Sequence, residues 1–118
     1  MSLLKTIDHA PEFTPQPGRP LPERVIDGSP EFLTWAMDET RNGQIKSGVW
    51  QATPGETYSI KGETFEFCHL LEGVIELTET GGETTTYRAG DSFILKPGFT
   101  GVWKTLETVR KIYVCVYH

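Results

Sequence analysis

The sequence predicts an all-β fold, an antiparallel sandwich or jelly roll, and three observations lead to this prediction. Turn-forming dipeptides recur at short intervals, among them Asn42-Gly43, Gly81-Gly82 and Pro97-Gly98. The segments between the turns are rich in Thr, Val, Ile, Tyr, Phe and Trp, and their polarity alternates with a period of two. The chain shows no convincing helical window. A jelly roll closes short strands of this kind into a double sheet with few exposed edges.

The length of 118 residues predicts one domain, which we divide into an extended N-terminal arm, residues 1–30, and a β-barrel domain, residues 31–118. Five prolines lie between Pro11 and Pro22. Because proline fixes φ and lacks an N–H group, this stretch cannot form a helix or a central strand. The arm is expected to pack along its own barrel or to reach across a second subunit, and a loose terminus is the alternative.

The strands are expected between the turn signals. Asn42-Gly43 tolerates the positive φ of a type I′ turn, so it would close a hairpin between residues 32–38 and 44–52. Gly81-Gly82 would close a second hairpin. The remaining turns separate the other expected strands, which are 56–61, 64–71, 74–80, 83–88, 91–95, 101–107 and 109–117.

One segment supports two local structures. Ser29-Pro30-Glu31 has the features of a helix start, with a capping hydroxyl, a proline at the first helical position and an acid in the first turn. The residues up to Met37 are too few for a helix of typical length, and an Asn-Gly turn follows them. We therefore favour a strand.

The composition excludes two classes of partner. The formal net charge is −5, and the acidic residues are spread along the chain rather than gathered in blocks. Nucleic acids and anionic membranes require a basic patch, so we expect neither, and a small-molecule ligand is the expected partner. Cys68 and Cys115 lie in apolar, strand-like surroundings, which favours buried reduced thiols over a disulfide. Without a signal-peptide-like run or an apolar span of bilayer length, a cytoplasmic location is expected.

Two stretches resemble the paired half-motifs of the cupin barrel, namely Glu66-Phe-Cys-His-Leu-Leu-Glu-Gly73 and Ala89-Gly-Asp-Ser-Phe-Ile-Leu-Lys-Pro-Gly98. The chain is most similar to the small single-domain cupins named after the ureidoglycine aminohydrolase cupin domain, most of which have no assigned function. The likeness covers residues from about 46 to 117. It also rests on these stretches: Gly48-Val-Trp50, Pro54-Gly55, Pro97-Gly98-Phe99-x-Gly101-x-Trp103 and Val109-Arg-Lys-x-Tyr113.

The resemblance implies a cupin jelly-roll barrel and, as a rule, a homodimer, but no single reaction. Metal-binding cupins carry histidines before the motif glutamate and after the second half-motif, and the corresponding positions here are Gly62, Ile60 and Gly101. We therefore expect no metal and no other cofactor. A histidine missing at Gly101 would leave room for the indole of Trp103, which shares its face.

Glu66 occupies the position of the motif glutamate, and strand alternation places it inside the barrel together with Cys68. A buried carboxylate has to be paired, ligated or protonated. Lys111 is its expected partner, because it shares one face of the last strand with Tyr113, a thiol and a second phenol. We predict catalytic roles for Glu66, Lys111 and Tyr113. A surface glutamate on a shifted register and an exposed edge-strand lysine are the alternatives.

Four further side chains are expected to contact a ligand, namely Trp50, Tyr58, Cys68 and Trp103. Large amphipathic rings grip planar or apolar groups in a cleft, although core packing is the commoner role of aromatic residues in small barrels. His69 falls on the face opposite the motif glutamate, so we expect a satisfied or surface histidine rather than a metal ligand.

Three functions are compatible with the sequence. The first is a metal-independent cupin that binds a small carbonyl, carboxylate or nitrogenous metabolite and, if catalytic, performs lyase or hydrolase chemistry with Glu66 as acid or base. The second is a metal-dependent enzyme resembling ureidoglycine aminohydrolase with substitute ligands. The third is a non-catalytic binding or assembly module whose barrel is filled by its tryptophans. An open cavity at Glu66 and Lys111 would favour the first function, and a packed interior the third.

Overall fold

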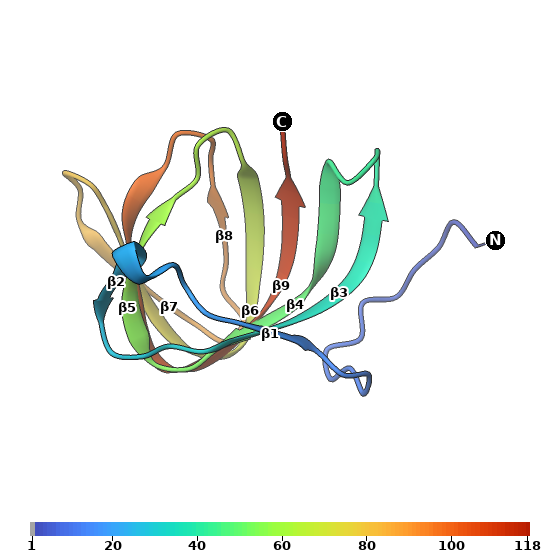
Figure 1. The fold of residues 1–118 in the computed structure, drawn as a ribbon, viewed down its shortest axis with the longest axis horizontal. Coiled ribbons are helices and arrows are strands. Elements are labelled where there is room, and N and C mark those ends of the chain that lie inside the picture. Colours follow the sequence, from blue (N-terminus) through green and yellow to red (C-terminus); the bar gives the residue numbers. More distant parts are fainter. Residues whose placement is uncertain (1) are drawn as a thin grey trace.

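Nine strands form one curled antiparallel sheet in the computed structural model, which describes residues 2–118 (Figure 1). This confirms the predicted all-β class. The strands are β1 (Gln16–Gly18), β2 (Val25–Asp27), β3 (Phe32–Thr40), β4 (Ile45–Ala52), β5 (Gly55–Ile60), β6 (Phe65–Glu79), β7 (Thr84–Arg88), β8 (Ser92–Leu95) and β9 (Thr100–Val116), with a short 3-10 helix, η1 (Pro22–Arg24), before β2.

The curled sheet has two halves, one with β3, β4 and β8 and the other with β2, β5 and β7, and the two long strands β6 and β9 run through both. In β9, residues 109–116 pair with β4, whereas residues 100–105 pair with β5. In β6, residues 66–69 pair with β8 and residues 74–78 pair with β7. Since β6 and β9 also pair with each other along most of their length, their curvature folds the sheet around an interior (Figure 1).

The continuity of these two strands differs from the prediction. We expected separate strands at 64–71 and 74–80, and again at 101–107 and 109–117, but each pair is one strand. Gly73 explains the first case: its φ is +91°, and a Cβ there would come within 2.4 Å of the Thr108 carbonyl oxygen. The glycine bends the strand against its neighbour, with shifts of register around it, and does not end it.

The turn at Asn42-Gly43 joins β3 to β4, as predicted. The last paired residues are Thr40 and Ile45, so four residues connect the strands, one fewer than the predicted strand ends at 38 and 44 would leave. Arg41, Asn42 and Gly43 all have positive φ, at 52°, 55° and 84°. The Gln44 N–H donates a hydrogen bond to the Arg41 carbonyl at 3.1 Å, so Asn42 and Gly43 form the centre of the turn with the positive φ expected of them.

The residues of the expected arm partly join the barrel. β1 pairs with β3, and β2 pairs with β5. The segment before β1 contacts the same chain, because the Trp35 indole donates a hydrogen bond to the Phe13 carbonyl (3.0 Å) and Arg110 donates one to the His9 carbonyl (3.1 Å). β3 begins at Phe32, which confirms the strand over the helix there. The division of the chain at residue 30 stays a prediction.

The core lies between the two halves of the sheet. Its members come mainly from β6, β8 and β9, and they are Ala52, Cys68, Leu70, Ile75, Leu77, Phe93, Leu95, Trp103 and Val109. Cys68 and Cys115 are both buried free thiols, as expected. Between residues 2 and 118 the structure has no helix of the length and hydrophobicity that a membrane span requires.

Candidate functional site

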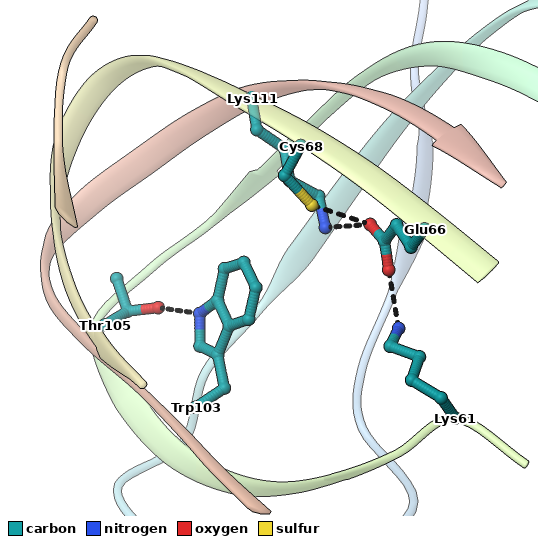
Figure 2. Close-up of polar contacts among 6 residues, drawn as sticks. All are labelled: Lys61, Glu66, Cys68, Trp103, Thr105 and Lys111. Carbon is teal, nitrogen blue, oxygen red and sulfur yellow. Dashed lines mark hydrogen bonds and ion pairs between the residues drawn. The ribbon is translucent and has the colours of Figure 1, made fainter. Parts of the chain in front are cut away.

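A buried cluster of charges centres on Glu66, inside the barrel (Figure 2). The Lys61 Nζ atom lies 2.5 Å from Glu66 Oε1, and the Lys111 Nζ atom lies 2.5 Å from Oε2. The Cys68 thiol donates a hydrogen bond to Oε2 at 3.2 Å. Glu66 is 4% exposed and Lys111 6%. One carboxylate therefore meets two ammonium groups, and the cluster carries a formal charge of +1.

Three elements bring these groups together. Glu66 and Cys68 are two residues apart on β6, and both are buried, as strand alternation predicts. Lys111 pairs with Leu70 of β6 in register, and its side chain points inward like that of Glu66 (Figure 2). Lys61 comes from the turn after β5. This turn is held to the loop between β8 and β9, because the Lys61 N–H donates a hydrogen bond to the Phe99 carbonyl at 3.0 Å.

Two indole rings surround the ammonium group of Lys111. Its Nζ atom lies 4.3 Å from the ring centroid of Trp50 and 4.7 Å from that of Trp103. Trp50 is the register partner of Lys111 on β4. The Trp103 indole is held by a hydrogen bond that its Nε1 donates to the Thr105 hydroxyl at 3.0 Å (Figure 2). Desolvated contacts of this kind contribute about 2 kcal/mol each, so the rings favour a charged lysine.

The contacts within the cluster fix its protonation. Burial alone would raise the pKa of Glu66, but the ammonium groups of Lys111 and Lys61 outweigh burial and lower that pKa from 4.5 to about 2. Burial alone would lower the pKa of Lys111, whereas Cys68 and Glu66 raise it above its ordinary value. Since burial raises the pKa of the Cys68 thiol to about 12, Glu66 is the anion that faces Lys111 at neutral pH.

Two cavities reach this cluster. A smaller one of about 190 Å³ opens on the β5 side, and a larger one of about 510 Å³ opens on the β3 and β4 side. Both are lined by five common residues, which are Trp50, Ile60, Lys61, Glu66 and Lys111. The charges therefore line a space that a small molecule can enter, and the tryptophans do not fill the barrel.

The other predicted site residues lie at different places. Tyr113 lines the larger cavity. Tyr58 contributes to the lining of the smaller one but is 50% exposed, and it pairs with Val102, one residue away from Trp103 and so on the other face of β9. His69 is outside the cluster, where its Nδ1 lies 2.7 Å from the Ser92 hydroxyl.

Sequence reasoning missed Lys61. Alternation along strands located Glu66 and Lys111, but Lys61 lies in a turn, where no such rule applies. Lys61 stands between Ile60 and Gly62, the two positions that the resemblance assigns to histidines in metal-binding cupins. In a continuous strand, a residue between two inward-facing positions would point away from the motif glutamate, so the sequence carried no signal for Lys61.

The room expected at Gly101 for the Trp103 indole does not exist. A Cβ atom at Gly101 would lie 2.3 Å from the Thr78 carbonyl oxygen and 2.8 Å from the Phe99 ring. The glycine is needed because the backbones of β6 and β9 approach closely there. Trp103 instead packs edge-on against Trp50, with ring centroids 5.7 Å apart.

The residues present do not fit a metal ion of the kind that cupins hold. Both oxygens of Glu66 face ammonium groups, and a cation beside them would meet a site that is already positive. Among residues 2–118, no three His, Cys, Asp or Glu side chains come together as a set of metal ligands.

This fold, with its interior site framed by the two half-motifs, defines a cupin barrel. The profile of the EutQ-like cupin domain family matches residues 39–113, and the chain belongs to that family. No curated protein matches the chain.

Solved structures give the same class. A protein of unknown function of the DUF861 family from Pseudomonas syringae pv. tomato is 27% identical, with a TM-score of 0.83 over 93% of this chain and 46% of that one. This chain thus spans about half the length of that relative. A DUF861 family protein from Thermotoga maritima is 34% identical, with a TM-score of 0.52 over 55% of this chain and 73% of that one. Ectoine synthase from P. lautus shares the fold, at 20% identity and a TM-score of 0.66, with 80% of this chain and 69% of that one covered.

Proposed function

We propose that the barrel binds a small organic anion, a carboxylate or a carbonyl compound with a negatively charged group, without the help of a metal. The observation that carries this proposal is the positive cluster of Lys61, Glu66 and Lys111 at the wall of two cavities. The chain as a whole has a net charge of −5, so positive charge gathered in its interior favours an anionic ligand.

The protonation of the cluster favours binding over acid–base chemistry. A carboxyl group with a pKa of about 2 is a weak base and holds no proton to donate at neutral pH. A lysine kept charged by Glu66 has no lone pair with which to form an imine. Lys111 therefore suits the stabilisation of negative charge on a ligand, and any turnover would use it to stabilise an oxyanion.

Binding can be measured directly with small probe molecules. We expect pyruvate, butyrate or succinate to bind the wild-type protein in isothermal titration calorimetry, and butyramide, the neutral counterpart of butyrate, to bind at least about tenfold more weakly. Lys61→Met should weaken carboxylate binding by about tenfold because it removes one of the two ammonium groups. Lys104→Met is the matched control, since Lys104 is an exposed lysine on β9.

Two outcomes would contradict this function. One is that butyrate and butyramide bind alike, or that none of the carboxylates binds. The other is stoichiometric manganese, iron, nickel or zinc in protein purified without added metal, which would support the metal-dependent alternative instead.

We also propose that the protein forms a homodimer through the outer face of β6, β8 and β9. Apolar side chains meet there without any carboxylate among them: Phe65, Phe67, Ile94, Ile112, Val114 and Val116. All are half-buried or exposed, with Ile94 51% exposed. A second copy is the natural occupant, because two acidic molecules can approach along this uncharged face without strong repulsion.

Light scattering after size-exclusion chromatography tests the dimer. The wild-type protein should have twice the chain mass of 13.3 kDa, and Ile94→Lys should shift it to the monomer mass because a charge would be buried in the interface. Leu106→Lys changes an exposed leucine outside the patch and should leave the dimer intact. A monomeric wild-type protein would rule the proposal out.

A further inference from the structure

The larger cavity has a third lysine in its wall, outside the Glu66 cluster. Its charged lining residues are Lys46, Lys61, Lys111 and Glu66, so the formal charge of its wall is +2. The cluster accounts for only one of these charges. The other is Lys46, which is 47% exposed at the mouth of the cavity.

The strand register places Lys46 in one row with Glu66. Lys46 of β4 pairs with Cys115 of β9, and Cys115 pairs in turn with Glu66 of β6. Directly paired residues point to the same side of a sheet, and Cys115 and Glu66 are both buried. Neighbouring strands lie about 5 Å apart, so the Cα atoms of Lys46 and Glu66 are separated by about 10 Å. The ammonium groups of Lys61 and Lys111 form ion pairs with the Glu66 carboxylate, so they lie at the Glu66 end of this row.

Lys46 is only weakly neutralised by its own neighbour. Its Nζ atom lies 3.6 Å from Glu39 Oε1, and both side chains are about half exposed, so this pair contributes little. Glu39 lines neither of the two cavities. The same Nζ atom lies 5.6 Å from the ring centroid of Tyr117, another lining residue, which keeps Lys46 beside the cavity.

Two phenols, one on β9 and one just after its end, lie on either side of Cys115, the residue that separates Lys46 from Glu66 in the register. Tyr113 and Tyr117 both line the larger cavity, and burial is the main cause that raises the pKa of each, that of Tyr117 to about 12. Both are therefore neutral hydrogen-bond donors at neutral pH. Gly48, the register partner of Tyr113, leaves space for the phenol, since a Cβ there would lie 3.0 Å from the Tyr113 hydroxyl.

From this arrangement we infer that the ligand is a dicarboxylate of about four to six carbons, with one carboxylate at Lys61 and Lys111 and the other at Lys46. This inference rests on the proposed function and specifies its ligand. A shorter acid would reach only the Glu66 cluster. A monocarboxylate would occupy the cluster and leave Lys46 without an anionic partner in the cavity.

Pairs of acids of equal length test this inference by calorimetry. Succinate is compared with butyrate, and glutarate with valerate, in a buffer free of carboxylates and at constant ionic strength. We expect the better dicarboxylate to bind about tenfold more tightly than its monocarboxylate counterpart. In Lys46→Met this ratio should fall to about one, while the affinity for butyrate changes by less than about twofold.

Lys5→Met provides the control, because Lys5 is also an exposed lysine paired with an acid, Asp38, but lines neither cavity at the cluster. It should keep the wild-type ratio. Equal binding of each acid pair to the wild-type protein would overturn the inference and leave the proposed function standing. An unchanged ratio in Lys46→Met would also overturn it. If neither class of acid binds, the proposed function fails and this inference fails with it.

Discussion

Lys111→Met is expected to lower the free energy of unfolding by about 3 kcal/mol, because it removes one partner of a buried ion pair. Glu66 would keep Lys61, whose side chain is partly exposed, as its one cationic partner, and the two indoles would lose the cation that they contact. Urea denaturation followed by circular dichroism measures the change. If the variant folds, carboxylate binding should be lost, since the Lys111 ammonium group that lines both cavities is gone.

Two further variants separate the ion pair from general damage. Lys104→Met, an exposed change on the same strand, should alter stability by less than about 0.5 kcal/mol. The double variant Glu66→Gln/Lys111→Met removes the unpaired buried carboxylate together with its partner, and it should recover at least about 1 kcal/mol relative to Lys111→Met. Equal stability of Lys111→Met and Lys104→Met would contradict the cluster as described.

Acid should weaken the protein through Glu66 by about 3 kcal/mol, which follows from a pKa of 4.5 in the unfolded chain and about 2 in the folded one. The folded-state pKa is the lower of the two, so this contribution is fully present above about pH 5. It is lost as the pH falls through 4.5 towards 2. Urea unfolding at a series of pH values between 7 and 2.5 follows the loss.

Glu66→Gln isolates this effect from that of the other acids. Other carboxylates titrate in both proteins, so the informative quantity is the difference in unfolding free energy between wild type and variant at each pH. The raised pKa of Lys111 keeps it charged throughout this range in the wild type. The difference should shrink as the pH falls below 4.5. A difference that stays constant from pH 7 to pH 2.5 would show that Glu66 is not held as a buried anion.

The strand alternation of this chain made the centre of the site predictable. Glu66 and Cys68 share one face of β6, and Lys111 faces them from β9, because a strand has a strict period of two. The all-β class followed from the same periodicity and from the turn dipeptides. The interior cavities follow from the curvature of the whole sheet, which no local pattern encodes.

What the sequence did not reveal depends on backbone geometry. Lys61 reaches Glu66 from a turn whose path is set by long-range hydrogen bonds to the Phe99 loop. A break between strands was expected at residues 72–73, whereas Gly73 is the place where β6 bends against β9. At Gly101 the neighbouring backbone fills the space that a missing side chain was expected to leave. A glycine that ends a strand, bends it or allows two backbones to approach looks the same in the sequence, and only the neighbours packed against it distinguish these cases.

The sharing of β6 and β9 between the two halves of the sheet has a consequence for how the chain folds. The chain joins the two halves twice, because residues 66–69 of β6 and 109–116 of β9 lie in one half and residues 74–78 and 100–105 of the same strands lie in the other. The pairing of β6 with β9 joins residues far apart in sequence, a non-local step of the kind that slows β-protein folding. Once that pairing is made, the remaining strands can add to its edges, and the same two strands supply Glu66 and Lys111 to the walls of both cavities.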